Sequence, residues 1–434
     1  MLDETIESGL TSRRFEREFI VPSYDDYCLS NVPGTILSIF GIKADRTLPA
    51  KCLDPIETAD IRTVVLIVVD GLGYDMWSKR RSDAGFFGRM TEKGLVFPIT
   101  TVFPSTTAAA LTTMYTGLTP QEHGLPEWNV YMKELDMIIS TLPFSAMGEG
   151  GRDGLLRTAD PRILFSGTPI FSALRDAGVR PLALLKETIA SSAYTRTALR
   201  GADVVPYSSL TDMAVKLRTS IEEAEEKTLV YAYWDGVDAV GHAYGPESEK
   251  CASELAALSR VLKEELLDKL RRGSASRTIL VVTADHGQID VSPDETIYLN
   301  AFGRVVSSFR TGDTGKPILP TWSPRDVALY IEDEKLDHIL EYLSKALSDR
   351  AVVMKTQDAI ERGLFGLGTP SRRFLDRAGN LLILPRGNRT IWYEHREGRR
   401  FDLLGMHGGP TERELLIPFA ISKLSRLLED CAGQ

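Results

Sequence analysis

The chain has 434 residues, of which 43% are hydrophobic and 26% are charged, a composition that is typical of globular proteins and excludes a disordered or fibrous chain. It is long enough for one large domain with insertions or for two smaller domains. Its 51 basic and 60 acidic residues give a net charge of -9, which argues against general affinity for nucleic acid or anionic membranes but leaves room for a local basic patch.

The cysteines and the N-terminal segment bear on the cellular compartment. Four cysteines are scattered without paired or metal-type spacing, which favours a reducing compartment over a disulfide framework: Cys28, Cys52, Cys251 and Cys431. The N-terminal MLDETIESGLTSRRFEREF is charged and lacks the apolar core of a signal peptide. The apolar runs are too short to span a bilayer. We therefore expect a soluble cytoplasmic protein without a membrane partner.

Three apolar runs along the chain share one design. RTVVLIVVDG ends in Asp70, KTLVYAYWDG leads into Asp235 and Asp238, and RTILVVTADHG ends in Asp285. Each run is continuous, rich in β-branched residues and stopped by an acidic residue and a glycine. Such runs predict strands that are buried on both faces of a parallel sheet.

Helical patterns lie between these strands, for example at 169–178 and 248–272. Alternating strands and helices predict an α/β fold with a doubly wound, mostly parallel sheet, whose ligand sites lie beyond the carboxyl ends of the strands. We expect residues 1–60 to form an N-terminal extension that packs on this core.

The pattern changes from about residue 300 to 400. Short runs such as DVALYIED, LDHILEYLSKALSD and NLLILPRG predict a small α+β subdomain inserted near the site, with approximate bounds 301–399. The core would then comprise 61–300 and 400–434, because DLLGMHGGPTERELLIPFAI reads as a polar glycine loop followed by another strand.

Three of the six histidines stand beside these acidic strand ends or in a glycine loop. His286 follows Asp285 directly, and His242 follows Asp238 by four residues, so that one helical turn would place both on one face. His407 lies in GMHGG, where the glycines allow a close backbone approach to a ligand.

Together with Asp70, three aspartates and three histidines can thus converge at one sheet edge. Carboxylates and imidazoles without thiolates suit zinc, manganese or iron. Six ligands exceed the need of one catalytic ion but suffice for two ions roughly 4 Å apart, the arrangement used in phosphoryl transfer. Singly, each residue could be a turn, cap or structural group, but their joint occurrence indicates a metal-dependent hydrolase.

The order of these motifs resembles that of the alkaline phosphatase superfamily. The similarity is greatest to its type I phosphodiesterase/nucleotide pyrophosphatase branch. Five motifs carry it: VDG at 69–71, TG-L-TP-x-x-HG at 116–124, DAVGH at 238–242, ADHG at 284–287 and MHGG at 406–409. The resemblance covers about 62–420, motif by motif, and segments 130–225 and 300–400 carry no family signature. It implies an alkaline-phosphatase-like fold.

The resemblance also implies a nucleophile. In this superfamily that residue stands ten positions before the glycine of a Thr-Gly pair, and counting back from Gly117 gives Thr107. Local sequence agrees, because a proline and a cap-like Ser105 precede a short alanine-rich helix whose first turn favours an anion. Thr106 is the closest rival, although a cap role suits it equally.

Carried over residue by residue, the resemblance implies two metal ions, with zinc as first choice and manganese or iron as alternatives. The expected metal ligands are, for one ion, Asp70, Asp285, His286 and the Thr107 oxygen, and for the other, Asp238, His242 and His407. Asp235 is the alternative to Asp238, but only Asp238 has the family's spacing to His242. We expect His123 to stabilise its own loop.

The sequence departs from the family pattern after the HG pair. Phosphodiesterase relatives place there an asparagine that helps to hold a phosphate oxygen, but in HGLPEWNVYM Asn129 stands one or two positions late. Asn129 is a candidate phosphate contact and Trp128 a candidate stacking surface for the substrate. Ordinary loop packing explains both equally well.

The resemblance implies hydrolysis of a small phosphodiester or nucleotide pyrophosphate through a phosphothreonine, with no nucleic-acid polymer as partner. A phosphomonoester or phosphonate is the next choice. A sulfatase or phosphoglycerate mutase fits less well, because the candidate nucleophile is a threonine. A non-catalytic binding protein on the same fold is the alternative from another class, although none of the six candidate ligands is missing. Dinucleotide binding is disfavoured because no GxGxxG follows a predicted strand.

Overall fold

A seven-stranded sheet forms the centre of the computed structural model, which describes residues 2–53, 56, 58, 60–149 and 151–428. The strand order is β2-β17-β9-β1-β8-β6-β7. The strands are β1 (Thr63–Val69), β2 (Leu95–Thr100), β6 (Arg180–Lys186), β7 (Asp203–Tyr207), β8 (Thr228–Trp234), β9 (Thr278–Thr283) and β17 (Leu416–Lys423). Only β17 runs antiparallel to its neighbours, so the predicted α/β fold with a mostly parallel sheet is confirmed.

The register of the three middle strands places the acidic strand ends together. Thr63 of β1 pairs with Thr228 of β8 and Thr278 of β9, and the three strands then run in parallel to the same edge. All residues of these strands are buried, as expected for runs of β-branched side chains covered on both faces. The residues that follow each strand therefore meet at one carboxyl edge.

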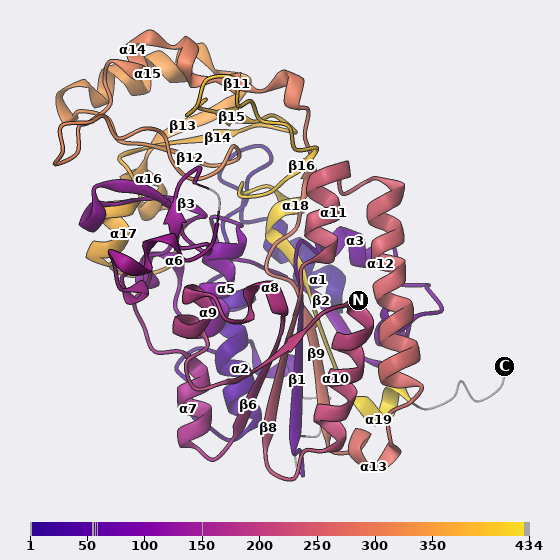
Figure 1. Cartoon of the computed structure of the whole chain (residues 1–434). Helices are drawn as coiled ribbons and strands as arrows, with labels where there is room; N and C mark the ends of the chain where they lie inside the picture. The colour runs from indigo at the N-terminus through magenta and orange to yellow at the C-terminus, as the bar shows by residue number, and fades with distance from the viewer. Residues whose placement is uncertain (1, 54–55, 57, 59, 150, 429–434) are drawn as a thin grey trace.

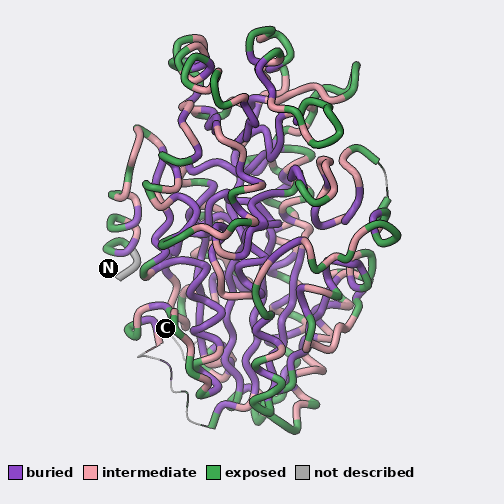
Figure 2. Tube along the Cα trace, turned by 90° about the vertical axis from the view of Figure 1, so that its left-hand side faces the viewer, coloured by how far each residue is buried: buried purple, intermediate pink, exposed green. Residues whose placement is uncertain are grey.

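Helices cover both faces of the sheet (Figure 1). One layer contains α2 (Val32–Ile39), α5 (Thr107–Thr116), α7 (Ile170–Asp176), α8 (Glu187–Ala190) and α9 (Ala193–Ala198). The other contains α3 (Tyr74–Ser78), α4 (Phe86–Lys93), α10 (Leu210–Glu222), α11 (Gly236–Tyr244), α12 (Glu249–Val261), α13 (Arg272–Ala275) and α19 (Leu424–Leu427). Figure 2 shows the strands as the continuously buried part of the chain between more exposed helices.

A smaller module lies beyond the carboxyl edge of the sheet (Figure 1). It contains a sheet of order β12-β14-β13 and has a hydrophobic cluster of its own, which includes Val327, Leu343 and Ile383. Its elements are β11 (Ile297–Tyr298), α14 (Gly303–Val306), β12 (Val327–Leu329), α15 (Leu336–Ala346), β13 (Ala351–Lys355), α16 (Thr356–Glu361), α17 (Arg372–Arg377), β14 (Leu381–Pro385) and β15 (Ile391–Trp392).

Two small sheets connect this module to the central sheet. A hairpin-like sheet follows the short helix α6 (Pro120–His123) and consists of β3 (Asn129–Met132), β4 (Met137–Ser140) and β5 (Ser145–Ala146). The second pairs β10 (Ile289–Asp290) with β16 (Gly405–Met406), after which α18 (Glu412–Leu415) leads into β17. Both bring loops to the carboxyl edge, where the candidate site lies.

The N-terminal segment packs on the main core. Helix α1 (Leu2–Thr11) contacts β2, and Ile6 and Leu10 are buried in the same cluster as the central strands. The domain boundaries at 60, 300 and 400 stay predictions. Among the described residues, Cys28, Cys52 and Cys251 are buried, whereas Cys431 lies outside them. None of the helices in the described ranges combines the length and apolarity needed to cross a membrane.

Candidate metal centre

The candidate nucleophile Thr107 is the first residue of α5. Its hydroxyl lies 3.0 Å from Nε2 of His286. Thr106 occupies the N-cap position, but its side chain makes no capping bond. Ser105 does not cap the helix either, because its hydroxyl donates to the Gly409 carbonyl at 2.7 Å and accepts from the Gly408 amide at 3.1 Å. The helix N-terminus therefore faces His286 with its own backbone N–H groups free of side-chain caps.

The first group of candidate ligands comes from strand ends, and we refer to Asp70, Asp285 and His286 as the strand-end half. Nε2 of His286 lies 3.3 Å from Asp70 Oδ1 and 3.4 Å from Asp285 Oδ2. These two carboxylate oxygens are buried and have no hydrogen-bond partner. Buried carboxylate oxygens without a donor are costly unless a cation meets them, so this group fits a bound metal ion.

The second group comes from α11 and the loop after β16, and we refer to Asp238, His242 and His407 as the helix–loop half. His242 Nε2 lies 3.3 Å from Asp238 Oδ2 and 3.2 Å from His407 Nε2. His407 in turn stacks on His286 with ring centroids 3.6 Å apart, which joins the two halves. All six candidate ligands and Thr107 thus lie together at the carboxyl edge, and their roles as metal ligands stay predictions.

The orientation of the imidazoles is the one that metal-binding histidines adopt. Nδ1 lies 2.7 Å from the Gly405 carbonyl in His242, 3.0 Å from the Gly287 carbonyl in His286 and 2.9 Å from the Ser105 carbonyl in His407. A carbonyl only accepts, so each Nδ1 carries a proton and Nε2 is the ring nitrogen that faces the centre. Three converging Nε2 atoms beside unpartnered carboxylate oxygens match the donor set of a divalent cation.

The two halves differ in charge balance. Burial, and then the neighbouring carboxylate charges, raise the pKa of Asp70 and Asp285 well above the usual range. Burial also opposes the ionisation of Asp238, but the imidazoles of His242 and His407 outweigh it and lower the pKa of Asp238. The strand-end half therefore lacks positive charge, whereas the helix–loop half is balanced internally.

Gly71 of the VDG motif supports these carboxylates together with Tyr233 and Gln288, to which no motif assigned a role. The Tyr233 hydroxyl donates to Asp70 Oδ2, and Gln288 donates to Asp238 Oδ1 at 2.9 Å. Gly71 has φ +74°, and a Cβ there would lie 3.0 Å from Asp238 Cα, so only glycine allows β1 and α11 to approach this closely. Tyr233 stands two residues before Asp235 and Gln288 three after Asp285, which is the sequence signal that could have identified them.

Asp235, the alternative to Asp238, and His123, which was expected to stabilise its own loop, have other partners. Asp235 forms an ion pair with Lys186 at 3.2 Å. His123 is buried, bonds Thr113 at 3.1 Å and accepts from the Leu125 amide at 3.0 Å, and burial lowers its pKa to about 3. It therefore ties α5 to its own loop, away from the carboxylate cluster.

A cavity of about 680 Å³ opens onto the centre. Trp128 and Asn129 both line it, and Trp128 is 39% exposed. The Asn129 amide oxygen accepts from Ser140 at 2.9 Å, which leaves its NH₂ group available as a donor. Glu127, a residue that the sequence analysis passed over, is buried beside Thr106, and burial raises its pKa to about 7.

The comparison with known families decides where this centre belongs. The sequence model of the type I phosphodiesterase/nucleotide pyrophosphatase family matches residues 64–410, well over half of the chain. The chain belongs to this family. The matched segment contains all six candidate ligands and Thr107, and the family resemblance predicted from the motifs is confirmed. Members of the family are metal-dependent, and the groups Asp70–Asp285–His286 and Asp238–His286–His407 could each hold an ion.

Individual relatives are distant. Venom phosphodiesterases 2 and 1 of Crotalus adamanteus are each 24% identical over 209 residues, which is 47% of this chain. The match spans only about a quarter of the length of these curated relatives, 24% and 23%.

Two solved structures share the fold over most of their length. Murine ectonucleotide pyrophosphatase/phosphodiesterase 5 is 19% identical with a TM-score of 0.62, covering 82% of this chain and 87% of that one. Phosphonoacetate hydrolase from Sinorhizobium meliloti 1021, in complex with phosphonoformate, is 20% identical with a TM-score of 0.60, covering 83% and 90%. Both show that this chain shares their fold.

Proposed function

We propose that this protein is a metal-dependent hydrolase of phosphate esters, a phosphodiesterase or nucleotide pyrophosphatase that acts through a phosphothreonine at Thr107. The observation that carries the proposal is the position of the Thr107 hydroxyl. It lies at the start of α5, 3.0 Å from His286 Nε2, and lines the same cavity as Asp70, beside the Asp70 and Asp285 oxygens that have no donor.

We assign one divalent ion to the strand-end half with Thr107 and the other to the helix–loop half, with zinc as first choice. When bound, the two ions supply positive charge that favours the Thr107 alkoxide and offsets negative charge on the phosphoryl and leaving oxygens. The support for this assignment is the donor set described above: three Nε2 atoms and buried carboxylate oxygens that no protein group satisfies.

The residues of the chain have separate tasks in this mechanism. The Thr107 oxygen attacks phosphorus, forming the threonine ester while the bond to the leaving oxygen breaks. Water then attacks the same phosphorus, and the bond to the Thr107 oxygen breaks. Two in-line displacements retain the configuration at phosphorus. The uncapped N–H groups of the first turn of α5 and the Asn129 amide line the same cavity, so both can donate to equatorial phosphoryl oxygens there.

The choice of a diester or pyrophosphate rests on the family and on its relatives. The venom relatives are named phosphodiesterases, and the murine relative has also been solved as an inactive variant with one threonine replaced by alanine, in complex with AMP. These support a threonine nucleophile and a ligand of nucleotide size. Because the bacterial relative was solved with a bound phosphonate, phosphonate hydrolysis is the alternative reaction that the experiment must exclude.

The test combines metal analysis with hydrolysis rates on four substrates. Purified protein is expected to contain divalent metal and to hydrolyse bis(p-nitrophenyl) phosphate and a dinucleotide polyphosphate faster than p-nitrophenyl phosphate, with phosphonoacetate as a fourth substrate. A preference for the monoester or the phosphonate would move the protein to another branch of the superfamily. Absence of both bound metal and metal-stimulated hydrolysis would overturn the proposal.

A further inference from the structure

A second cavity, of about 700 Å³, adjoins the candidate active site. Its floor is apolar and comes from the β3–β4 hairpin and the segment after β5, with Met137, Ile138 and Met147. Its walls come from two segments of the inserted module, 314–319 and 392–400. We refer to it as the basic pocket, for the side chains described next.

Four cationic side chains line the basic pocket: Lys316, Arg396, Arg399 and Arg400. In the described part of the chain, none of the four forms an ion pair with a carboxylate. The one carboxylate of the lining, Asp136, is held by neutral donors instead, the Tyr131 hydroxyl at 2.5 Å and the Thr314 amide at 2.6 Å. The pocket thus concentrates unneutralised positive charge in a protein whose net charge is -9.

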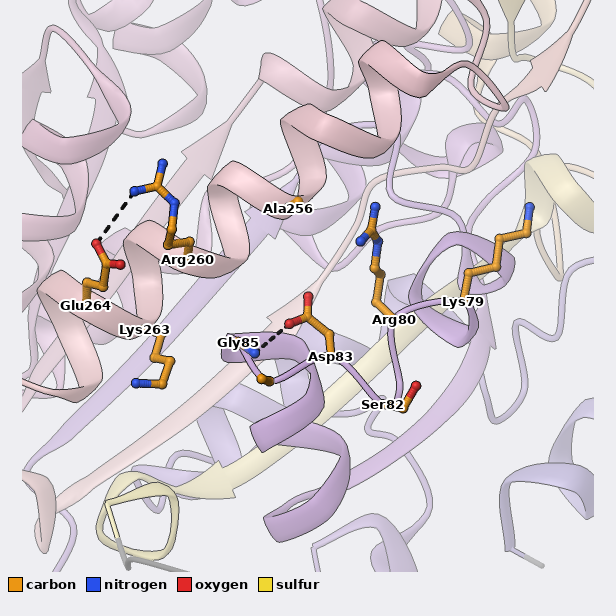
Figure 3. A pocket seen from close by; sticks show the side chains of 10 residues that line it. Lys79, Arg80, Ser82, Asp83, Gly85, Ala256, Arg260, Lys263 and Glu264 are labelled. Atoms are coloured by element: carbon orange, nitrogen blue, oxygen red, sulfur yellow. Dashed lines mark hydrogen bonds and ion pairs between the residues drawn. The ribbon is translucent and has the colours of Figure 1, made fainter.

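A second basic cavity of similar size provides a comparison, because most of its cationic side chains do form ion pairs with carboxylates. The cavity of about 680 Å³ in Figure 3 is lined by four cations, Lys79, Arg80, Arg260 and Lys263. Three of the four have an acidic partner: Lys79 with Glu247 at 2.8 Å, Arg260 with Glu264 at 3.7 Å and Lys263 with Asp268 at 2.8 Å. Arg80 instead donates to the Ala252 carbonyl at 2.7 Å. Most of the cations in that cavity thus complete surface ion pairs, unlike those of the basic pocket.

The basic pocket is continuous with the candidate active site. Trp392 and Arg400 line both cavities. The Arg400 guanidinium lies 5.7 Å from the ring centroid of Tyr298, which positions it over that ring. The Arg396 guanidinium packs closely on Gly148, where an added Cβ would lie 3.2 Å from Cζ. A molecule that is held at Thr107 can therefore extend past Trp392 to these cations.

We propose that the basic pocket binds a second phosphate group of the substrate, beyond the phosphorus that Thr107 attacks. The inference rests on the proposed function for the place of attack but not for the pocket itself. Planar guanidinium groups bind phosphate oxygens bidentately. An arginine without a carboxylate partner does not have to break an existing ion pair when it binds phosphate. The aromatic ring of Trp392 and the methionine floor accept the less polar part that joins the two phosphates.

The pocket alone is tested by calorimetry of inorganic tripolyphosphate against protein stripped of metal with EDTA, where the carboxylate-rich centre repels anions. We expect Arg396→Gln/Arg399→Gln to weaken binding at least tenfold. The matched control, Arg260→Gln/Lys263→Gln, removes two cations from the cavity in Figure 3 and should retain wild-type affinity. Equal affinity of the wild type and the first variant, or an equal loss in the control, would overturn the proposal.

The substrate assignment is tested with metal-loaded protein and a matched pair of substrates, the p-nitrophenyl ester of a nucleoside 5′-monophosphate with and without a 3′-phosphate. The wild type is expected to prefer the 3′-phosphorylated ester about tenfold in kcat/KM, and Arg396→Gln/Arg399→Gln to lose that preference. A wild type without preference would overturn the assignment to substrate, even where tripolyphosphate binds. If no ester is hydrolysed at all, the proposed function fails, and the calorimetry still decides the pocket.

Discussion

The strand-end half and the helix–loop half of the candidate centre have the same ligand types but different surroundings. Side chains of the strand-end half are 0–6% exposed, whereas those of the helix–loop half are 9–22% exposed. The strand-end half follows two adjacent strands of a rigid sheet, and the other depends on one helix and a glycine loop. The comparison indicates that one half is fixed by the fold and short of positive charge, and that the other is adjustable and internally balanced.

Thr107 faces the strand-end half, so its replacement tests that half most severely. Thr107→Ala is expected to lower kcat by a factor on the order of 10³ or more, because no other oxygen replaces the nucleophile, while metal content stays nearly unchanged. Steady-state rates and metal analysis measure both. Thr106→Ala is the matched control with near-normal activity; a dead Thr106→Ala beside a fully active Thr107→Ala would show that the nucleophile is the neighbouring residue.

His242 belongs only to the helix–loop half, and its loss separates the two. His242→Ala is expected to remove about one equivalent of metal and to lower kcat/KM on the order of 10²-fold, because the strand-end ligands remain in place. Metal analysis after dialysis gives the stoichiometry. The exposed His338→Ala on α15 removes an equivalent imidazole far from the centre and should change neither value. Loss of both ions from His242→Ala would mean that the halves bind metal as one unit.

Gly71 contacts both halves and so forms the joint between them. Its amide donates to Asp285 Oδ1 at 3.1 Å, and its α-carbon faces Asp238. Gly71→Ala is expected to destabilise the fold by about 1–3 kcal/mol and to lower activity about tenfold, since the new Cβ pushes α11 from β1. Denaturant unfolding and rates measure the two effects. Gly41→Ala has the same left-handed backbone, φ +79°, with nothing near the Cβ. It isolates backbone strain, and equal activity losses in both variants would refute the role of the joint.

Much of the strand-end half was predictable from sequence because its signals are local. A continuous β-branched run that ends in aspartate and glycine predicts both the strand and the edge at which the carboxylate lies. The pairing of His242 with Asp238 was equally local, since it needs only the helical repeat. Strands β6 and β7 lie in the segment 130–225, which carries no family signature, so only the general α/β pattern anticipated them.

The remainder depends on contacts between distant segments. Ser105 reads as a cap from its neighbours, yet in the structure it binds the loop of Gly408 and Gly409, which no local pattern reveals. Tyr233 is an ordinary strand residue until β1 brings Asp70 beside it. The basic pocket likewise combines residues near 136, 316 and 396, whose charges are unremarkable when each segment is considered alone.

Glu127 provides the smallest-scale test of the charge difference between the two halves, because its buried carboxyl can add negative charge near Thr106. His286 is among the groups whose charge acts on it. Burial raises its pKa in the folded state to about 7, from 4.5. A carboxyl with a raised folded pKa supports the fold fully below pH 4.5, and this support is lost as pH rises through 7. In metal-free wild type we therefore expect the free energy of unfolding to fall by about 2–3 kcal/mol between pH 4.5 and pH 8 through this group.

Glu127→Gln is expected to lack this contribution, so its stability should change less over the same range. Urea unfolding in EDTA at pH 5 and pH 8 measures the difference between the two proteins, with the exposed Glu225→Gln as a control that keeps the wild-type slope. If Glu127→Gln and wild type lose stability in parallel, the excess negative charge would be confined to Asp70 and Asp285. We expect the free energy of unfolding to depend less on pH in Glu127→Gln than in the wild type. In that case the lack of positive charge extends to the loop that carries Trp128 and Asn129, and bound cations would offset it there as well.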